Sequence, residues 1–304
     1  MKSLLFVESP LQLLNAYEAI QYFSLTDYKI FIRYSNNLKN DEQIRFILQK
    51  LKIKNSIEFT IKSESKQLSD YLKLFLWKYR FLFKTDVDKL FIGNYDSGFL
   101  SLIMKQFKKE QIILLDDGAK TLSIQNGFTQ NNFYSLFTMY KLEPFNSQKI
   151  YKNEYINISN SLQSLQKDET KVLFLGTKLS ESEIITEKYY LDLIHLISKY
   201  YKDKKIIYIV HRGESEENLR KIKQYKNITV KYLDYPVELY GLYEKEIPST
   251  IASFYSTALY TMKNIYNLEA NSFTFDYTSS KHVNAIKSVY EYYKKYLKVI
   301  ELND

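Results

Sequence analysis

The sequence predicts an α/β protein built from two Rossmann-like domains, whose parallel sheets face each other across a cleft. Short β-branched and aromatic runs alternate with longer amphipathic segments, which is the pattern of parallel strands joined by crossover helices. Two such series follow one another, and no internal repeat relates them. The 304 residues suffice for two domains that each bury a core. We place the domains at residues 1–155 and 156–304, joined within a polar stretch rich in Asn, Gln, Ser and Lys.

In the first series, Ser9 and Pro10 form an N-cap and first-turn pair for a helix that continues at helical spacing through Leu14 and Tyr17. Helices fill the gaps between the strands, and a short helix is also expected near residues 133–140. The expected strands cover residues 3–7, 29–33, 56–61, 89–93 and 112–115.

In the second series, the clearest helix covers residues 182–200, and His195 is expected to pack on its apolar face. The last helix, near residues 281–297, mixes tyrosines with lysines. Such a helix can lie on a membrane or dock back across the domain junction, and the sequence leaves both open. The expected strands cover residues 171–175, 205–210, 228–233, 250–254 and 272–275.

Composition excludes several kinds of chemistry. Cysteine is absent, so the chain has no disulfide and no thiolate metal site. The three histidines, His195, His211 and His282, lie far apart, and no metal-binding spacing occurs. We therefore expect chemistry that needs no metal ion and no cofactor.

The net charge of +8 favours anionic partners such as nucleic acid, an anionic membrane surface, or a phosphorylated or acidic-sugar substrate. Nucleic acid is not expected, because the basic residues are dispersed and no nucleic-acid-binding motif is evident. The apolar start of the chain is interrupted by Glu8 and Pro10, and no stretch approaches a membrane span of about 18 residues. We expect a cytoplasmic protein, and leave open both a peripheral contact with the inner face of the plasma membrane and a homodimer.

Two carboxylates and a glycine, Asp116, Asp117 and Gly118, come directly after a hydrophobic strand. Neighbouring acids near a cleft repel each other, which raises one pKa and suits a general base that takes a proton from a hydroxyl. Asp-Gly after a strand is also a common turn signal, so an ordinary turn is the alternative.

His211 ends a strand of the second series and is followed by Arg212, Gly213 and Glu214. A histidine there can serve as an acid for a leaving group, while Arg212 supports negative charge. A purely structural histidine is the alternative.

Ser253, Ser256 and Thr257 lie where a strand gives way to a helix. The unpaired N–H groups and positive dipole of a helix start can hold a phosphate together with Ser and Thr hydroxyls. The same hydroxyls are ordinary N-caps, so simple capping is the alternative.

Weaker signals are expected to serve the same cleft. They comprise residues for the nucleotide (Gly176, Thr177, Tyr235, Pro236 and Glu238) and residues for the acceptor sugar (Ser9, Pro10, Gln12, Asn94 and Gly118).

An ordered set of short motifs resembles the bacterial sialyltransferases of glycosyltransferase family 52. Their wider kin, including the bacterial polysialyltransferases, share an acid-acid-Gly motif, a His-Pro motif and a late Ser/Thr motif. Where those relatives often carry proline after the histidine, this chain has Arg212. The set spans nearly the whole chain: Glu8-Ser9-Pro10-Leu11-Gln12, Asp116-Asp117-Gly118, His211-Arg212-Gly213-Glu214, Tyr235-Pro236-Val237-Glu238 and Ser253-Phe254-Tyr255-Ser256-Thr257-Ala258-Leu259.

The resemblance implies a GT-B fold, a CMP-sialic acid donor, inversion at the anomeric carbon and no metal requirement. It places the base on Asp116 first and Asp117 second, the acid on His211, and the phosphate-binding hydroxyls on Ser256 and Thr257. The implied acceptor is a galactose-type hydroxyl of a bacterial surface glycan, such as capsule or lipooligosaccharide. The acid–base chemistry agrees, because a carboxylate can deprotonate the acceptor while a histidine protonates the departing phosphate.

Two alternatives stay open. Another CMP-activated nonulosonic acid or a Kdo-type donor would leave the same catalytic residues in place. A non-catalytic protein that binds nucleic acid or glycans would show no turnover.

Overall fold

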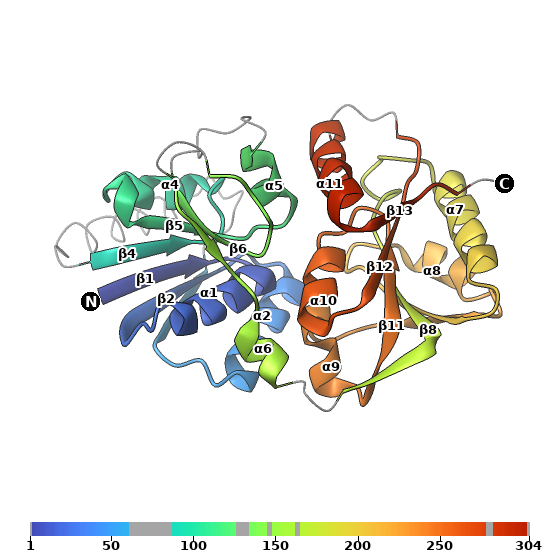
Figure 1. Ribbon diagram of the computed structural model, residues 1–304, viewed down its shortest axis with the longest axis horizontal. Helices are drawn as coiled ribbons and strands as arrows, with labels where there is room; N and C mark the ends of the chain where they lie inside the picture. Colours follow the sequence, from blue (N-terminus) through green and yellow to red (C-terminus); the bar gives the residue numbers. More distant parts are fainter. Residues whose placement is uncertain are drawn as a thin grey trace. The chain divides into compact units, whose positions relative to one another are not determined.

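The computed structural model of the chain describes residues 2–60, 87–125, 134–144, 148–161, 165–277 and 282–302 (Figure 1). The chain divides into two compact units, which we call unit 1, Met1–Asn157, and unit 2, Ile158–Asp304. Each unit has its own parallel sheet, and the two are described in turn.

Unit 1 is built on a seven-stranded sheet in the order β3-β2-β1-β4-β5-β6-β7, with every pair parallel. Its described helices are α1 (Pro10–Tyr22), α2 (Leu38–Lys50), α4 (Gly98–Met104), the short η1 (Lys109–Gln111), α5 (Ala119–Gln125) and α6 (Ile156–Asn160), the last of which runs into unit 2. The strands are β1 (Lys2–Val7), β2 (Asp27–Tyr34), β3 (Ser56–Thr60), β4 (Val87–Ile92), β5 (Ile112–Leu115), β6 (Ser135–Thr138) and β7 (Ile150–Lys152).

The local sequence explains how unit 1 starts. Leu4 to Val7 of β1 are buried on both faces of the sheet, as expected for a central parallel strand. The Ser9 hydroxyl then accepts a hydrogen bond from the Gln12 N–H at 3.3 Å, and Pro10 occupies the first turn of α1. The end of β1 is therefore followed at once by a capped helix.

Unit 2 is built on a six-stranded parallel sheet in the order β10-β9-β8-β11-β12-β13. Helices α7 and α8 lie on one side of this sheet and α10 on the other (Figure 1). The helices are α7 (Glu187–Tyr200), α8 (Glu216–Ile222), η2 (Val237–Leu239), α9 (Tyr240–Tyr243), α10 (Ala258–Tyr266) and α11 (Val283–Tyr296). The strands are β8 (Gln166–Leu175), β9 (Lys205–Ile209), β10 (Ile228–Lys231), β11 (Glu246–Ser253), β12 (Glu269–Phe273) and β13 (Lys298–Ile300).

Each sheet has a point at which the strand order reverses. In unit 1 the chain moves outward from β1 to β2 and β3, and β4 then pairs with the other side of β1. In unit 2 it moves from β8 to β9 and β10, and β11 then pairs with the other side of β8. Ligands of open parallel sheets bind at the carboxyl ends of the strands at such points. The fold thus marks one candidate edge in each unit.

The predicted fold class of two parallel-sheet α/β domains is confirmed, but two local predictions are wrong. Residues 133–140 were expected to be helical, yet Ser135–Thr138 forms β6, because this short segment pairs on both sides and buries Leu136 and Phe137. His195 is exposed on α7, since Ile194 and Ile197 face the core instead. For the last helix, where two alternatives were left open, the structure shows α11 bonded to residues of unit 2.

Two tyrosines fix α11 to its own unit. The Tyr290 hydroxyl donates to the Phe273 carbonyl at 2.8 Å, and the Tyr293 hydroxyl donates to the Ser256 carbonyl at 2.6 Å. The tyrosines of this helix therefore serve core packing. Among the described helices, none is long and apolar enough to cross a bilayer.

Candidate functional site

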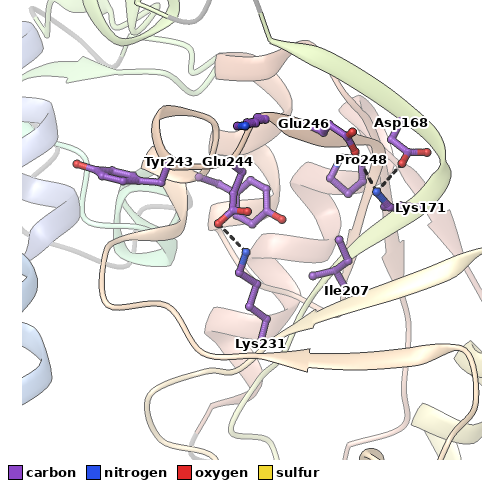
Figure 2. A pocket seen from close by; sticks show the side chains of 10 residues that line it. Asp168, Lys171, Ile207, Lys231, Tyr243, Glu244, Glu246 and Pro248 are labelled. Carbon is purple, nitrogen blue, oxygen red and sulfur yellow. Dashed lines mark hydrogen bonds and ion pairs between the residues drawn. The ribbon is translucent and has the colours of Figure 1, made fainter.

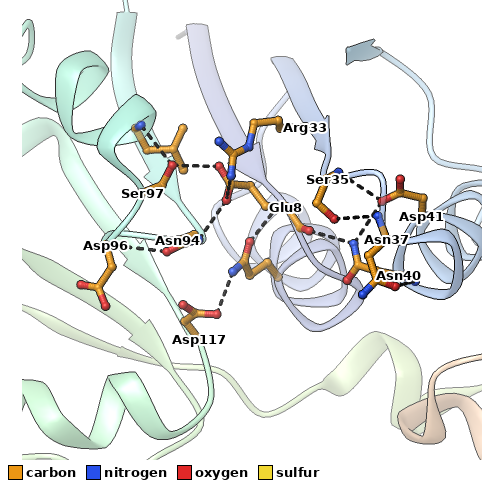
Figure 3. A network of polar contacts seen from close by, with 12 residues as sticks. Glu8, Arg33, Ser35, Asn37, Asn40, Asp41, Asn94, Asp96, Ser97 and Asp117 are labelled. Carbon is orange, nitrogen blue, oxygen red and sulfur yellow. Dashed lines mark hydrogen bonds and ion pairs between the residues drawn. The ribbon is translucent and has the colours of Figure 1, made fainter. Parts of the chain in front are cut away.

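The carboxyl ends of β1, β4 and β5 carry a connected set of polar side chains (Figure 3). The Glu8 carboxylate, directly after β1, accepts hydrogen bonds from Arg33 at 2.8 Å, Asn94 at 2.9 Å and Ser97 at 3.1 Å. The Asn40 amide donates to the Glu8 carbonyl at 3.1 Å. Burial raises the pKa of Glu8, and the Arg33 guanidinium opposes that rise. With its carboxylate and carbonyl both engaged, Glu8 organises this edge and is not an open ligand.

Asp117 is the acid of the pair that remains reachable. Its side chain is 17% exposed, accepts a hydrogen bond from Gln12 at 2.7 Å and lies 3.6 Å from the Lys120 ammonium. Its backbone N–H donates to the Thr121 hydroxyl at 2.8 Å, which fixes the turn. Burial raises its pKa, while Gln12 and Lys120 lower it. A fixed carboxylate with a raised pKa can accept a proton from a substrate hydroxyl.

Asp116 points into unit 1 instead. The residue is 1% exposed, and its Oδ2 accepts the Met139 N–H at 2.8 Å, which joins the end of β5 to the end of β6. Burial raises the pKa of Asp116 to about 7. Gly118 completes the turn with a φ of 61°, a left-handed conformation that favours glycine, so its role is conformational.

Of the other residues predicted to bind the acceptor, two begin a helix and one lies in the polar set around Glu8. Ser9 and Pro10 begin α1, as an ordinary capped helix start requires. Asn94 is half-buried and lies beside Glu8, with its carbonyl oxygen 3.5 Å from Lys120. Arg33 and Ser97 were missed by the sequence analysis. Ser97 had a usable signal, since it is the N-cap of the helix that follows β4, whereas Arg33 lies inside a strand.

In unit 2, His211 follows β9 at the corresponding edge. Its ring Nδ1 accepts the Gly213 N–H at 3.1 Å. An acceptor Nδ1 carries no hydrogen, so in the neutral ring the hydrogen lies on Nε2. The Ser253 hydroxyl, at the end of β11, donates to the Leu175 carbonyl at 2.8 Å and joins β11 to the end of β8.

Glu214 was expected to contact the nucleotide, but its carboxylate turns into the core. It accepts the His211 N–H at 2.6 Å, the Tyr190 hydroxyl at 3.0 Å and the Tyr208 hydroxyl. Burial raises the pKa of Glu214 to about 7. Gly176 makes room for this arrangement, because a Cβ there would lie 2.3 Å from Glu214 Oε2. Both residues support the His211 loop from behind.

Ser256 and Thr257 precede α10, and the simple-capping alternative is not realised there. Thr257 occupies the cap position without a side-chain cap hydrogen bond, whereas Thr186 of α7 and Ser215 of α8 each accept one. Both hydroxyls are half-buried, and among the described residues neither has a hydrogen-bond partner. A helix start with two unengaged hydroxyls is suited to an anion.

The remaining predicted nucleotide residues are spread over this unit. Arg212 and buried Glu238 interact: burial lowers the pKa of Arg212 and the Glu238 charge counters it. The Tyr235 hydroxyl donates to Glu244 at 2.9 Å, and its ring stacks on Tyr243 with centroids 4.5 Å apart. The Tyr235 side chain therefore packs against the end of α9. Pro236 caps η2, and the buried Thr177 donates its backbone N–H to the Tyr190 hydroxyl at 3.4 Å.

A pocket of about 350 Å³ lies elsewhere in unit 2 (Figure 2). Lys171 pairs with Asp168 at 2.7 Å and with Glu246 at 2.9 Å, and Lys231 pairs with Glu244 at 2.5 Å. These paired charges neutralise one another, and no residue of the predicted site lines the pocket. Within the described ranges, no three His, Asp or Glu side chains gather as a metal site requires. The strand ends are therefore the better candidate.

Comparison with known proteins identifies the fold. No protein-family model matches the chain, and no curated protein sequence matches it either. Among solved structures, it is similar to UDP-GlcNAc 2-epimerase from Methanocaldococcus jannaschii in complex with UDP-GlcNAc and UDP (TM-score 0.59, 15% identity, 96% of this chain and 92% of that chain).

Two further structures have the same architecture. UDP-GlcNAc 2-epimerase from Neisseria meningitidis bound to UDP-GlcNAc has a TM-score of 0.55 at 12% identity, over 97% of this chain and 91% of that chain. MurG from Acinetobacter baumannii has a TM-score of 0.54 at 10% identity, over 99% of this chain and 86% of that chain.

These comparisons correct the family resemblance. The similar structures described above are UDP-GlcNAc 2-epimerases and MurG rather than CMP-sialic acid sialyltransferases, so the assignment to glycosyltransferase family 52 is wrong. Short motifs misled because Asp-Asp-Gly and Ser-Thr recur at the strand ends of many α/β proteins. The fold itself stands: the chain consists of two α/β domains with parallel sheets, as in GT-B-like proteins.

Proposed function

We propose that the protein is a glycosyltransferase that takes its sugar from a nucleotide-sugar donor. In this proposal unit 2 binds the donor phosphate at the carboxyl ends of β8, β9 and β11, and Asp117 of unit 1 is the general base. The observation that carries the proposal is the start of α10, where Ser256 and Thr257 present hydroxyls that do no capping.

The chemistry of the phosphate site follows from its groups. At the start of α10 the N–H groups of Leu259 and Tyr260 donate to the carbonyls of Ser256 at 3.0 Å and Thr257 at 3.2 Å. The donors offered to a phosphate are therefore the Ser256 and Thr257 hydroxyls, next to the positive end of the helix dipole. In this proposal His211, whose Nδ1 accepts the Gly213 N–H, adds the N–H of its Nε2 as a further donor to the phosphate. Donors aimed at a leaving phosphate stabilise the charge that develops as the glycosidic bond breaks.

For the base we favour Asp117 over Asp116. A general base must come within hydrogen-bond reach of the proton that it removes. Asp116 is 1% exposed and bonded to the Met139 backbone, whereas Asp117 is 17% exposed. The carboxylate of Asp117 is thus the one that can meet an acceptor hydroxyl.

The similar solved structures support a nucleotide sugar as the ligand class, since two of them are named for bound UDP-GlcNAc. They also supply the second candidate function, epimerisation of a nucleotide sugar. The two activities differ in products. A transferase releases the nucleotide and joins the sugar to an acceptor, whereas an epimerase converts one sugar stereoisomer into another.

The experiment is a donor panel of UDP-linked, ADP-linked and CMP-linked sugars, CMP-sialic acid included, each with and without mixed glycan acceptors. Chromatography with mass spectrometry follows nucleotide release, glycan mass and sugar configuration. We expect one donor class to give acceptor-dependent nucleotide release, and an EDTA arm tests our proposal that no metal ion takes part. Epimerised sugar without transfer favours the second candidate, and no binding of any nucleotide or nucleotide sugar refutes both.

A further inference from the structure

The side-chain amide of Gln12 is held at both ends. Its Oε1 accepts the backbone N–H of Glu8 at 2.8 Å, and its Nε2 donates to Asp117 Oδ1 at 2.7 Å. The residue is 2% exposed. Because the Glu8 N–H must meet an oxygen, the amide has one satisfactory orientation, and that orientation directs its NH2 group at Asp117.

Gly93 leaves the space that Gln12 occupies. A Cβ at Gly93, just after β4, would lie 2.6 Å from Gln12 Oε1 and 2.8 Å from Gln12 Cβ. Real Cβ atoms do not come so close to their neighbours, so any larger residue would displace the amide. The ends of β1, β4 and β5 therefore meet around one side chain of α1.

This contact acts on the charge of the carboxylate. A hydrogen bond donated to a carboxylate stabilises its ionised form. For Asp117, burial raises the pKa, and the Gln12 hydrogen bond is the foremost opposing effect, followed by the Lys120 charge. The Asp96 carboxylate acts in the same direction as burial. Gln12 thus controls both the direction of the carboxylate and its readiness to release a proton.

We propose that Gln12 is the positioning residue of Asp117, and does not contact the acceptor sugar as its sequence position suggested. The inference rests on the proposed function only in taking Asp117 as the base. The clamp itself is defined by the contacts to Glu8 and Asp117, whatever reaction the protein performs.

Two variants test the clamp against a matched control. Gln12→Met keeps the side-chain volume and removes the donor. Gln12→Glu keeps the shape and places a second carboxyl against Asp117, where two carboxylates cannot both ionise easily. The control is Asn40→Ala, which removes an amide donor from the carbonyl of the same Glu8 and does not touch Asp117.

The primary readout is a carbon-13 NMR titration of the Asp117 carboxyl, assigned with Asp117→Asn. We expect the midpoint to move upward in both Gln12 variants and to stay at the wild-type value in Asn40→Ala. The second readout is the pH profile of kcat/KM, whose acidic limb should move with the midpoint, giving a fall of roughly tenfold on the acidic side.

The two readouts separate two failures. An unchanged NMR midpoint in the folded Gln12 variants overturns the positioning role, even if activity falls. An equal loss of kcat/KM at every pH likewise overturns it, because that marks a structural role. A shifted midpoint in proteins that turn over no nucleotide sugar supports the clamp and removes the glycosyltransferase proposal.

Discussion

Replacing Gly176 by alanine tests how unit 2 supports His211. The added Cβ would lie 2.3 Å from Glu214 Oε2 and 2.8 Å from the Tyr208 ring. Tyr208 cannot yield, because it is fully buried and stacks on Phe174 with ring centroids 5.5 Å apart. Glu214 must move instead, and its hydrogen bond to the His211 N–H is then lost.

The magnitude follows from these two effects. Overpacking a filled interior costs about 1–3 kcal/mol. Loss of a buried hydrogen bond to a carboxyl group costs about 1–2 kcal/mol more. The lower chain entropy of alanine in the unfolded state returns about 0.5 kcal/mol. We expect Gly176→Ala to lower the free energy of unfolding of unit 2 by about 2–4 kcal/mol.

The assay is urea unfolding followed by hydrogen-exchange mass spectrometry, which reports on the peptides of each unit separately. Gly98→Ala is the matched control, since a Cβ at Gly98 meets no atom within 4 Å, and its effect should stay within about 0.5 kcal/mol. The reasoning is refuted if the two variants lose similar stability. It is also refuted if Gly176→Ala weakens nucleotide binding no more than Gly98→Ala does.

Three further predictions concern single side chains. Thr257→Ala should weaken nucleotide binding roughly tenfold at little cost in stability. The control Ser215→Ala removes the side-chain cap of α8, so it should cost about 1 kcal/mol of stability and leave nucleotide binding intact. Calorimetry measures the binding and urea unfolding measures the stability. Asp117→Asn should lower kcat by about 10²–10⁴, and steady-state rates at saturating donor check this. The pKa of Asp116 is about 7 in the folded protein against 3.8 for an exposed aspartate, so the fold favours the protonated carboxyl. The stability that this gives is fully present below about pH 4 and is lost as the pH rises to about 7. Asp116→Asn should flatten that slope in unfolding measured from pH 4 to 8, and an unchanged slope would contradict the burial argument.

The fold class could be predicted from the sequence because the central strands are buried on both faces. Leu4 to Val7 and Val172 to Leu175 read as continuous apolar runs, and each became a central strand of its sheet. The two three-residue edge strands, β7 and β13, gave weaker signals. Neither Ile150–Lys152 nor Lys298–Ile300 was predicted, since three residues carry no period.

The sequence assigned the candidate residues to strand ends, and the functional roles given to them stay predictions. The structure places these motifs after the carboxyl ends of their own strands, because topology alone brings them there. Whether a given side chain faces solvent or core depends on neighbours that sequence spacing does not reveal. Glu214 was assigned to a ligand, yet Tyr190 and Tyr208, from two other elements, draw it inward.

The acidic pair shows why spacing cannot assign such roles. Successive residues at the end of a strand point to opposite sides, so of two adjacent aspartates one is expected inside and one outside. Which one is inside depends on the backbone N–H of Met139 at the end of β6, a strand that was not predicted. Asp116 bonds that N–H, and Asp117 is left facing Gln12 and Lys120. The sequence therefore left the base open between the two acids, with Asp116 as the first choice. The contact with the end of β6 buries Asp116 and leaves the Asp117 side chain 17% exposed.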